Sequence, residues 1–160
     1  MKRLKIYLDT SVISHLDQQD APEKMSDTLK LWDDIKLGLY DVYISDVALD
    51  EIYKCSQTKL AILEKYLAEI EYNYVIADNE VLELAEHFIS NHILTTKSIE
   101  DCRHIACSMI QECDVIVSWN FKHIVNHKTI KGVKLVSVMT GYDEVAIYTP
   151  TFLTGGERVE

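Results

Sequence analysis

The stretch Leu4-Lys5-Ile6-Tyr7-Leu8-Asp9-Thr10-Ser11 opens the chain with a short apolar run that ends at three residues typical of helix caps. The run from Leu4 to Leu8 has the length and the apolar content of a buried strand. Asp9, Thr10 and Ser11 would begin a helix directly after it. A strand that leads into a capped helix is the first half of a βα unit, so this stretch predicts an α/β fold.

Segments of helical and strand character alternate along the rest of the chain. Apolar residues recur at helical spacing in the segments 22–38, 46–55, 58–70, 78–91 and 98–113. Strand-like segments lie between or after them, at 41–45, 72–76, 115–118 and 134–138. This alternation predicts a three-layer α/β/α sandwich with a mostly parallel central sheet, in which ligands bind beyond the carboxyl ends of the strands.

The composition fits a single folded domain. At 160 residues and 48% hydrophobic content, the chain is long enough to bury one core. We expect this domain to span residues 1–141. The tail at 142–160, with Thr149-Pro150 and Gly155-Gly156, predicts a loose C-terminal extension that could contact a partner.

The formal net charge of −10 argues against a broad phosphate-binding surface, because nonspecific affinity for nucleic acid depends largely on Lys and Arg. A local basic patch could still hold RNA if the acidic side chains are concentrated at a metal site. The candidate patch consists of Lys122, His123, His127, Lys128, Lys131 and Lys134. An acidic surface also suits a basic protein partner.

The first residues and the cysteines predict a cytoplasmic protein. The chain begins with a basic segment, but the apolar run after it is broken at Asp9, which makes it too short for a signal peptide or a membrane span. The cysteines form no C-x-x-C pair, and we expect them to be reduced and buried. They are Cys55, Cys102, Cys107 and Cys113.

Carboxylates stand where an acid-lined metal site would need them. Asp9 follows the first strand, Glu51 lies inside the helix 46–55, and Asp101 lies at the start of the helix 98–113. Carboxylates from distant parts of a chain repel one another unless a divalent cation lies between them. Their convergence would therefore indicate a metal site, and we expect it to cleave phosphodiester bonds in RNA.

Each carboxylate also has a structural explanation. Asp9 could cap the helix that follows it, and Glu51 could extend outward from the edge of an apolar stripe. Ser98-Ile99-Glu100-Asp101 fits a capping box, which alone would explain Asp101. His104, three residues further on, fits a partly buried, hydrogen-bonded histidine better than a ligand.

Asn120 lies in Ser118-Trp119-Asn120-Phe121-Lys122-His123, directly after the most β-branched run of the chain. Its side chain could supply a carbonyl ligand or an amide donor without adding charge to a site that already holds three anions. It could equally be a turn residue, with Trp119 and Phe121 in the core.

Together these pieces resemble a PIN domain, in particular the VapC-type toxins of prokaryotic toxin-antitoxin pairs. The resemblance covers Leu4 to about Val138, with the motifs in the right order. It rests on Leu8-Asp9-Thr10-Ser11, on Val47-Ala48-Leu49-Asp50-Glu51-Ile52, on Glu100-Asp101-Cys102-Arg103-His104-Ile105-Ala106, and on Val117-Ser118-Trp119-Asn120-Phe121-Lys122-His123.

The resemblance implies an endoribonuclease whose acidic cluster holds Mg²⁺ or Mn²⁺. Asp9, Glu51 and Asp101 would be the metal ligands, and Asn120 would complete the polar wall of the catalytic site. Many relatives carry an acid near the position of His123, so a second cation would be weakly held here or absent. The resemblance also implies a type II toxin, a cognate antitoxin as partner, and a homodimer.

Two other functions remain open. The acidic net charge and the departure at His123 favour a PIN-like module that binds RNA or a protein with little or no cleavage. An aspartyl phosphotransferase with Asp9 as its nucleophile would normally need a second acid two residues on, where this chain has Ser11.

Overall fold

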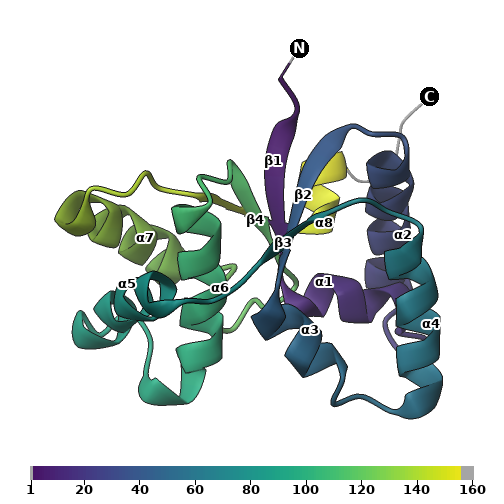
Figure 1. The fold of residues 1–160 in the computed structure, drawn as a ribbon, viewed down its shortest axis with the longest axis horizontal. Helices are drawn as coiled ribbons and strands as arrows, with labels where there is room; N and C mark the ends of the chain where they lie inside the picture. The colour runs from purple at the N-terminus through teal and green to yellow at the C-terminus, as the bar shows by residue number, and fades with distance from the viewer. Residues whose placement is uncertain (1, 156–160) are drawn as a thin grey trace.

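In the computed structural model, which describes residues 2–155, a five-stranded sheet lies between two groups of helices (Figure 1). All paired strands are parallel, and their order is β3-β2-β1-β4-β5. The predicted α/β/α sandwich with a parallel sheet is therefore confirmed. The strands are β1 (Leu4–Leu8), β2 (Tyr40–Ser45), β3 (Asn73–Val75), β4 (Val115–Val117) and β5 (Ala146–Tyr148).

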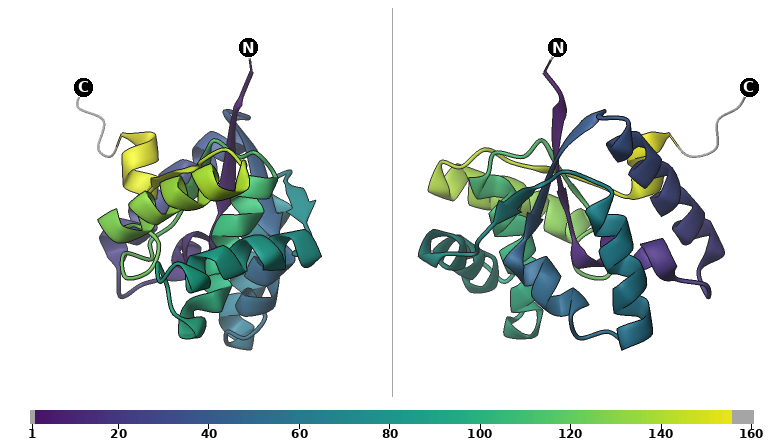
Figure 2. Two further views of the ribbon diagram at one scale, coloured as in Figure 1. Left: turned by 90° about the vertical axis from the view of Figure 1, so that its left-hand side faces the viewer. Right: turned by 45° about the vertical axis from the view of Figure 1, so that its right-hand side comes forward.

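The helices cover both faces of the sheet (Figures 1 and 2). One face is covered by α5 (Asn79–Ser90), α6 (Ile99–Ile110) and α7 (His127–Thr140), on the left of Figure 1. The other side carries α1 (Thr10–Ser14), α2 (Pro22–Lys36), α3 (Asp46–Ile52), α4 (Gln57–Ala68) and α8 (Pro150–Thr154). Short 3-10 turns at His15–Asp17 and Thr96–Ser98 complete the connections.

Each face of the sheet has its own hydrophobic core. Successive side chains of a strand point to opposite faces, so Ile6 and Leu8 pack with α2 and α4, whereas Tyr7 packs with α5 and α6. On β4, Ile116 belongs to the core of Tyr7. Because both faces are covered, the central strands are apolar throughout, which explains the continuous apolar run at the start of the chain.

The connections of the sheet reverse direction between β1 and β4. From β1 the chain adds β2 and β3 on one side of the sheet, and β4 and β5 on the other. The carboxyl ends of β1 and β4 therefore form the topological switch point at which open α/β sheets bind ligands. Asp9 directly follows β1 and Ser118 directly follows β4, and the backbone N–H of Asp9 donates to Val117 O at 3.1 Å.

The segment 134–138, predicted to be the last strand, lies within α7, so that prediction is wrong. The buried apolar residues here are Val133 and Val136, which are one helical turn apart and pack in the core with α5 and α6. Gly132 lets this helix approach closely, since a Cβ at this position would lie 2.5 Å from Ile93 Cγ2.

Part of the segment predicted to be a loose extension joins the sheet. β5 pairs with β4, and the backbone N–H of Ser118 donates to Tyr148 O at 3.0 Å. α8 packs against α2, where Thr151 Oγ1 donates to Asp27 Oδ2. Residues 156–160 of the predicted extension lie outside the described residues, and its contact with a partner stays a prediction.

Two further sequence predictions concern membranes and cysteines. Of the helices in residues 2–155, none has the length and apolar character that crossing a bilayer requires. Cys102, Cys107 and Cys113 are buried and free, and Cys55 is partly exposed and free. Burial raises the pKa of each of the three buried thiols to about 12, so they are protonated and inert at neutral pH.

Candidate active site

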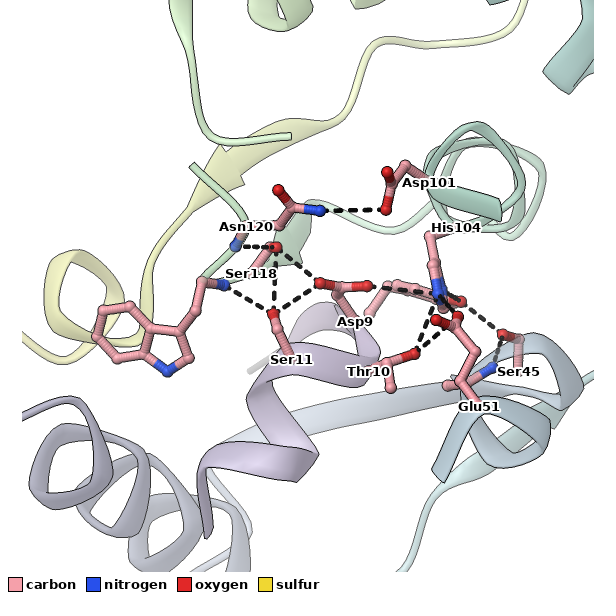
Figure 3. Close-up of polar contacts among 12 residues, drawn as sticks. Asp9, Thr10, Ser11, Ser45, Glu51, Asp101, His104, Ser118 and Asn120 are labelled. Atoms are coloured by element: carbon pink, nitrogen blue, oxygen red, sulfur yellow. Dashed lines mark hydrogen bonds and ion pairs between the residues drawn. The ribbon is translucent and has the colours of Figure 1, made fainter. Parts of the chain in front are cut away.

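The predicted site residues come from separate elements that meet at the carboxyl ends of β1 and β4 (Figure 3). Asp9 follows β1, Glu51 lies in α3, Asp101 lies in the first turn of α6, and Asn120 follows β4. Asp9 is central in Figure 3, Glu51 lies to its right, and Asp101 and Asn120 lie above it in this view. Folding thus brings all four predicted side chains to one place.

Asp9 is 3% exposed, and hydroxyl groups fix its carboxylate. Its Oδ2 accepts hydrogen bonds from Ser11 Oγ at 2.7 Å and from Ser118 Oγ at 2.8 Å. These two hydroxyl oxygens accept the backbone N–H groups of Trp119 and Asn120, each at 2.9 Å. Asp9 makes no side-chain cap bond to α1, so capping does not explain this residue.

His104 lies between Asp9 and Glu51. Its side chain is 1% exposed, and its Nε2 is 2.7 Å from Glu51 Oε1 and 3.4 Å from Asp9 Oδ1. Thr10 Oγ1 donates to the same Glu51 oxygen at 3.0 Å. Glu51 is therefore turned into the site instead of outward. The interpretation of His104 as a hydrogen-bonded buried histidine is correct, but it is bonded to the site itself.

The other ring nitrogen of His104, Nδ1, forms a hydrogen bond in a buried network. Nδ1 is 2.6 Å from Tyr7 Oη, which is also 2.6 Å from Ser45 Oγ. Ser45 caps α3 by accepting the backbone N–H of Ala48 at 3.2 Å. This buried network joins β1, β2, α3 and α6, and it keeps Nε2 of His104 directed at the two carboxylates.

The interaction between His104 and Glu51 shifts the pKa values of the two groups in opposite directions. Burial alone would lower the pKa of His104, but the negative charge of Asp9 and the hydrogen bond that His104 donates to Glu51 raise it above its usual value. Burial alone would raise the pKa of Glu51, but the hydrogen bond and charge of His104 hold it below its usual value. The two carboxylates thus favour the protonated form of the imidazole.

Asp101 has no such cation in contact. Burial, followed by repulsion from Asp9, raises the pKa of its carboxyl group to about 6. Its Oδ1 accepts a hydrogen bond from Asn120 Nδ2 at 3.1 Å. Ser98 makes no side-chain cap bond at the start of α6, so the capping box is not formed. The raised pKa shows that negative charge at this position is only partly compensated.

Asn120 joins Asp101 to the loop after β4. Its Nδ2 donates to Asp101, while its Oδ1 accepts the backbone N–H of His123 at 3.0 Å. The turn interpretation is therefore correct, and it is compatible with a place in the site wall. Of its neighbours, Trp119 is buried, but Phe121 is 49% exposed and does not lie in the core.

The donor groups fit Mg²⁺ or Mn²⁺, because hard cations prefer carboxylate and amide oxygens. Within residues 2–155, however, no group of three or more His, Cys, Asp or Glu side chains is arranged so that it could hold a metal ion. His104 Nε2 lies between the carboxylates of Asp9 and Glu51. The metal-binding role of these residues stays a prediction, and it requires both carboxylates to exchange His104 for the ion.

The structure divides the predicted basic patch. Lys122, His123 and Lys128 line a cavity of about 310 Å³ that lies beside Asn120. Lys131 and Lys134 are exposed on α7 and do not line it. Only half of the patch residues therefore line the cavity beside Asn120.

Several polar residues of the site were not assigned to it from the sequence. They occupy the strands themselves or the first positions after them, where a polar residue at the carboxyl end of a buried parallel strand is a usable signal. They are Tyr7, Thr10, Ser11, Ser45 and Ser118.

No family model matches the sequence, and no curated protein matches it at a significant level. The structure is similar to a chain in the crystal structure of VapBC2 from Rickettsia felis bound to a DNA fragment from their promoter. The TM-score is 0.57 at 10% sequence identity, and the match covers 91% of this chain and 98% of that chain. A likeness at this identity concerns the fold, and the chain has the PIN-like α/β/α fold.

Proposed function

We propose that this protein is a metal-dependent endoribonuclease that acts as the toxin of a type II toxin-antitoxin pair. The observation that carries the proposal is the convergence of Asp9, Glu51 and Asp101 at the topological switch point. The pKa of Asp101, raised to about 6 by burial and by Asp9, indicates excess negative charge that a divalent cation would neutralise. The fold similarity to a VapBC2 chain supports the toxin part of the proposal.

Asp9, Glu51 and Asp101 would hold Mg²⁺ or Mn²⁺ at this edge of the sheet. Such an ion would neutralise charge on a phosphate and lower the pKa of a water for in-line attack on phosphorus. Two hydroxyl groups already fix Asp9 through its Oδ2, so Oδ1 is the oxygen that would bind the ion in place of His104. Asn120 keeps Asp101 oriented through its amide group, and no serine or cysteine nucleophile is required.

The test is cleavage of a labelled RNA with Mg²⁺ or Mn²⁺ by the full chain and by the variants Asp9→Asn and Asp101→Asn. Each variant should lose more than about 100-fold in rate, because even changes to groups that only orient metal ligands cost about 10–100-fold. Asp50→Asn is the matched control, since it makes the same change at an exposed position of α3 next to Glu51. Full cleavage by both site variants would refute the proposal.

The second candidate is a PIN-like module that binds RNA or a protein with little or no cleavage. It is favoured by His104, whose Nε2 lies 3.4 Å from Asp9 Oδ1 and 2.7 Å from Glu51 Oε1, and by the net charge of −10. Calorimetric titration with Mn²⁺, in parallel with the cleavage assay, separates the two candidates. Metal or RNA binding with intact RNA after long incubation would favour the module.

The partners implied by the proposal are an antitoxin and a second copy of the chain, in the cytoplasm. An adjacent reading frame that encodes a small protein with a basic, DNA-binding half would support the antitoxin. Co-expression should then give a stable complex that suppresses cleavage. Sedimentation of the purified chain would determine whether it is a homodimer.

A further inference from the structure

The cavity beside Asn120 shares a wall with the acidic side chains. The backbone N–H of His123, which lines the cavity, donates to Asn120 Oδ1, and the amide group of Asn120 donates to Asp101. Ser98, at the start of α6, also lines the cavity, with its Oγ 3.4 Å from His123 Nδ1. The hydrogen bonds from the cavity lining to Asp101 thus pass through one side chain, that of Asn120.

The rim of the cavity is cationic in a strongly anionic protein. Lys122 and Lys128 are both exposed and line it, and across residues 2–155 neither forms an ion pair with a carboxylate. Lys128 lies in the first turn of α7, where Asn126 Oδ1 already caps the helix by accepting the backbone N–H of Thr129 at 2.9 Å. The two unpaired ammonium groups are therefore the features that favour a phosphate group here.

Apolar side chains form part of the cavity lining, which also has an aromatic side. Ile93 and Leu94 are buried and contribute to its lining. Phe121, at 49% exposure, is also part of the lining, and the ammonium group of Lys24 lies 5.3 Å from its ring centroid. An exposed aromatic ring beside cations is the arrangement that stacks a base and holds the attached backbone in single-stranded nucleic acid.

We infer that this cavity is a subsite for one nucleotide of single-stranded RNA, adjacent to the phosphodiester bond at the carboxylates; the inference rests on the proposed function. The base stacks on Phe121 over the apolar floor, and a neighbouring phosphate lies between Lys122 and Lys128. The subsite accounts for RNA binding by a protein of net charge −10, because it places the cations where the chain is cleaved. Stacking tolerates every base, so the preference for sequence at this position is weak.

The test measures RNA affinity without cleavage. A short fluorescent oligouridylate is titrated with the full chain in EDTA, its anisotropy is recorded over a range of salt concentrations, and a gel confirms that the RNA stays intact. The variants are Phe121→Ala and the double variant Lys122→Ala/Lys128→Ala. The matched control is Lys131→Ala/Lys134→Ala, which removes the same charge from exposed positions of α7 outside the cavity.

Phe121→Ala should weaken binding about tenfold, as the loss of one stacked base does. The double variant at the rim should weaken it about tenfold at low salt, and lower the magnitude of the slope of log affinity against log salt by about 0.7, because the contact with one phosphate is lost. The control pair should change affinity by less than about threefold.

If the rim pair and the control pair weaken RNA binding equally, the inference is overturned, because the loss of affinity would then follow from the change in net charge alone. Absence of RNA binding by the parental chain would overturn it as well. Binding that depends on Phe121 and the rim lysines, by a chain that cleaves no RNA with Mg²⁺ or Mn²⁺, would support the subsite and refute the proposed nuclease function.

Discussion

Asp101→Asn should stabilise the metal-free protein at neutral pH while it removes the proposed activity. Asparagine keeps an oxygen that can accept the hydrogen bond from Asn120 Nδ2, so the local geometry is preserved. It removes a charge that burial and Asp9 disfavour. The change therefore relieves repulsion without creating a cavity or an unpaired polar group.

The magnitude follows from the pKa of Asp101. A rise from 3.8 to about 6 corresponds to about 3 kcal/mol, at about 1.36 kcal/mol for each pH unit. Because the carboxyl group is partly in contact with solvent, screening reduces this to about 1–2 kcal/mol. For a domain of this length, the melting temperature should rise by about 3–6 °C.

The effect depends on pH in a defined direction. Below pH 3.8 the carboxyl group is protonated in both the folded and the unfolded state, so it costs nothing. Between pH 3.8 and about 6 the group ionises in the unfolded state but stays largely protonated in the folded state, so the folded state loses stability until the pH passes about 6. The advantage of the variant should be complete at pH 7.5 and fall to about a third of that value at pH 4.5.

The assay is urea unfolding in EDTA at both pH values. Glu100→Gln is the matched control, because it removes a charge from the same turn of α6 at an exposed side chain that pairs with Arg103. We expect the control to change the free energy of unfolding by less than about 0.5 kcal/mol in the destabilising direction. An Asp101→Asn protein that is no more stable than the parent at pH 7.5 would refute the reasoning.

Three further changes test the packing around the site by urea unfolding. Gly132→Ala should destabilise by about 1 kcal/mol despite its better helix propensity, because the new Cβ would meet Ile93 at 2.5 Å; a gain in stability would contradict the close approach. Thr28→Val should cost about 1–3 kcal/mol, since it leaves the indole N–H of Trp119 without its acceptor, whereas Thr28→Ser should cost clearly less. Tyr7→Phe should cost about 1–3 kcal/mol, because two buried partners lose its hydroxyl group, and an unchanged midpoint would argue against the network.

Local sequence patterns were sufficient to predict the elements that position the site. The strand from Leu4 to Leu8 and the polar residues after it are contiguous, so length, apolar content and cap chemistry define them without reference to the rest of the chain. The placement of Asp9 and Asn120 at one edge then follows from the rule that parallel strands end together.

The incorrect secondary-structure predictions concern segments in which tertiary packing decides between helix and strand. Residues 134–138 are rich in β-branched side chains, and only the contact of Val133 and Val136 with α5 and α6 selects the helix. β5 consists of three partly buried residues, Ala146–Tyr148, which are too few to show alternation. The place of His104 depends on Tyr7, 97 residues earlier in the chain, and no local pattern reports such a contact.

The pairing of β1 with β4, and of β4 with β5, has a consequence for protein synthesis. Asp9 is among the first residues translated, but the hydroxyl group of Ser118 that fixes it is made 109 residues later, and the strand beside Ser118 ends at Tyr148. The carboxylates therefore cannot assemble on the ribosome until most of the chain has emerged. A ribonuclease built in this order would stay inactive toward its own message during translation, and an antitoxin would have that interval in which to be made.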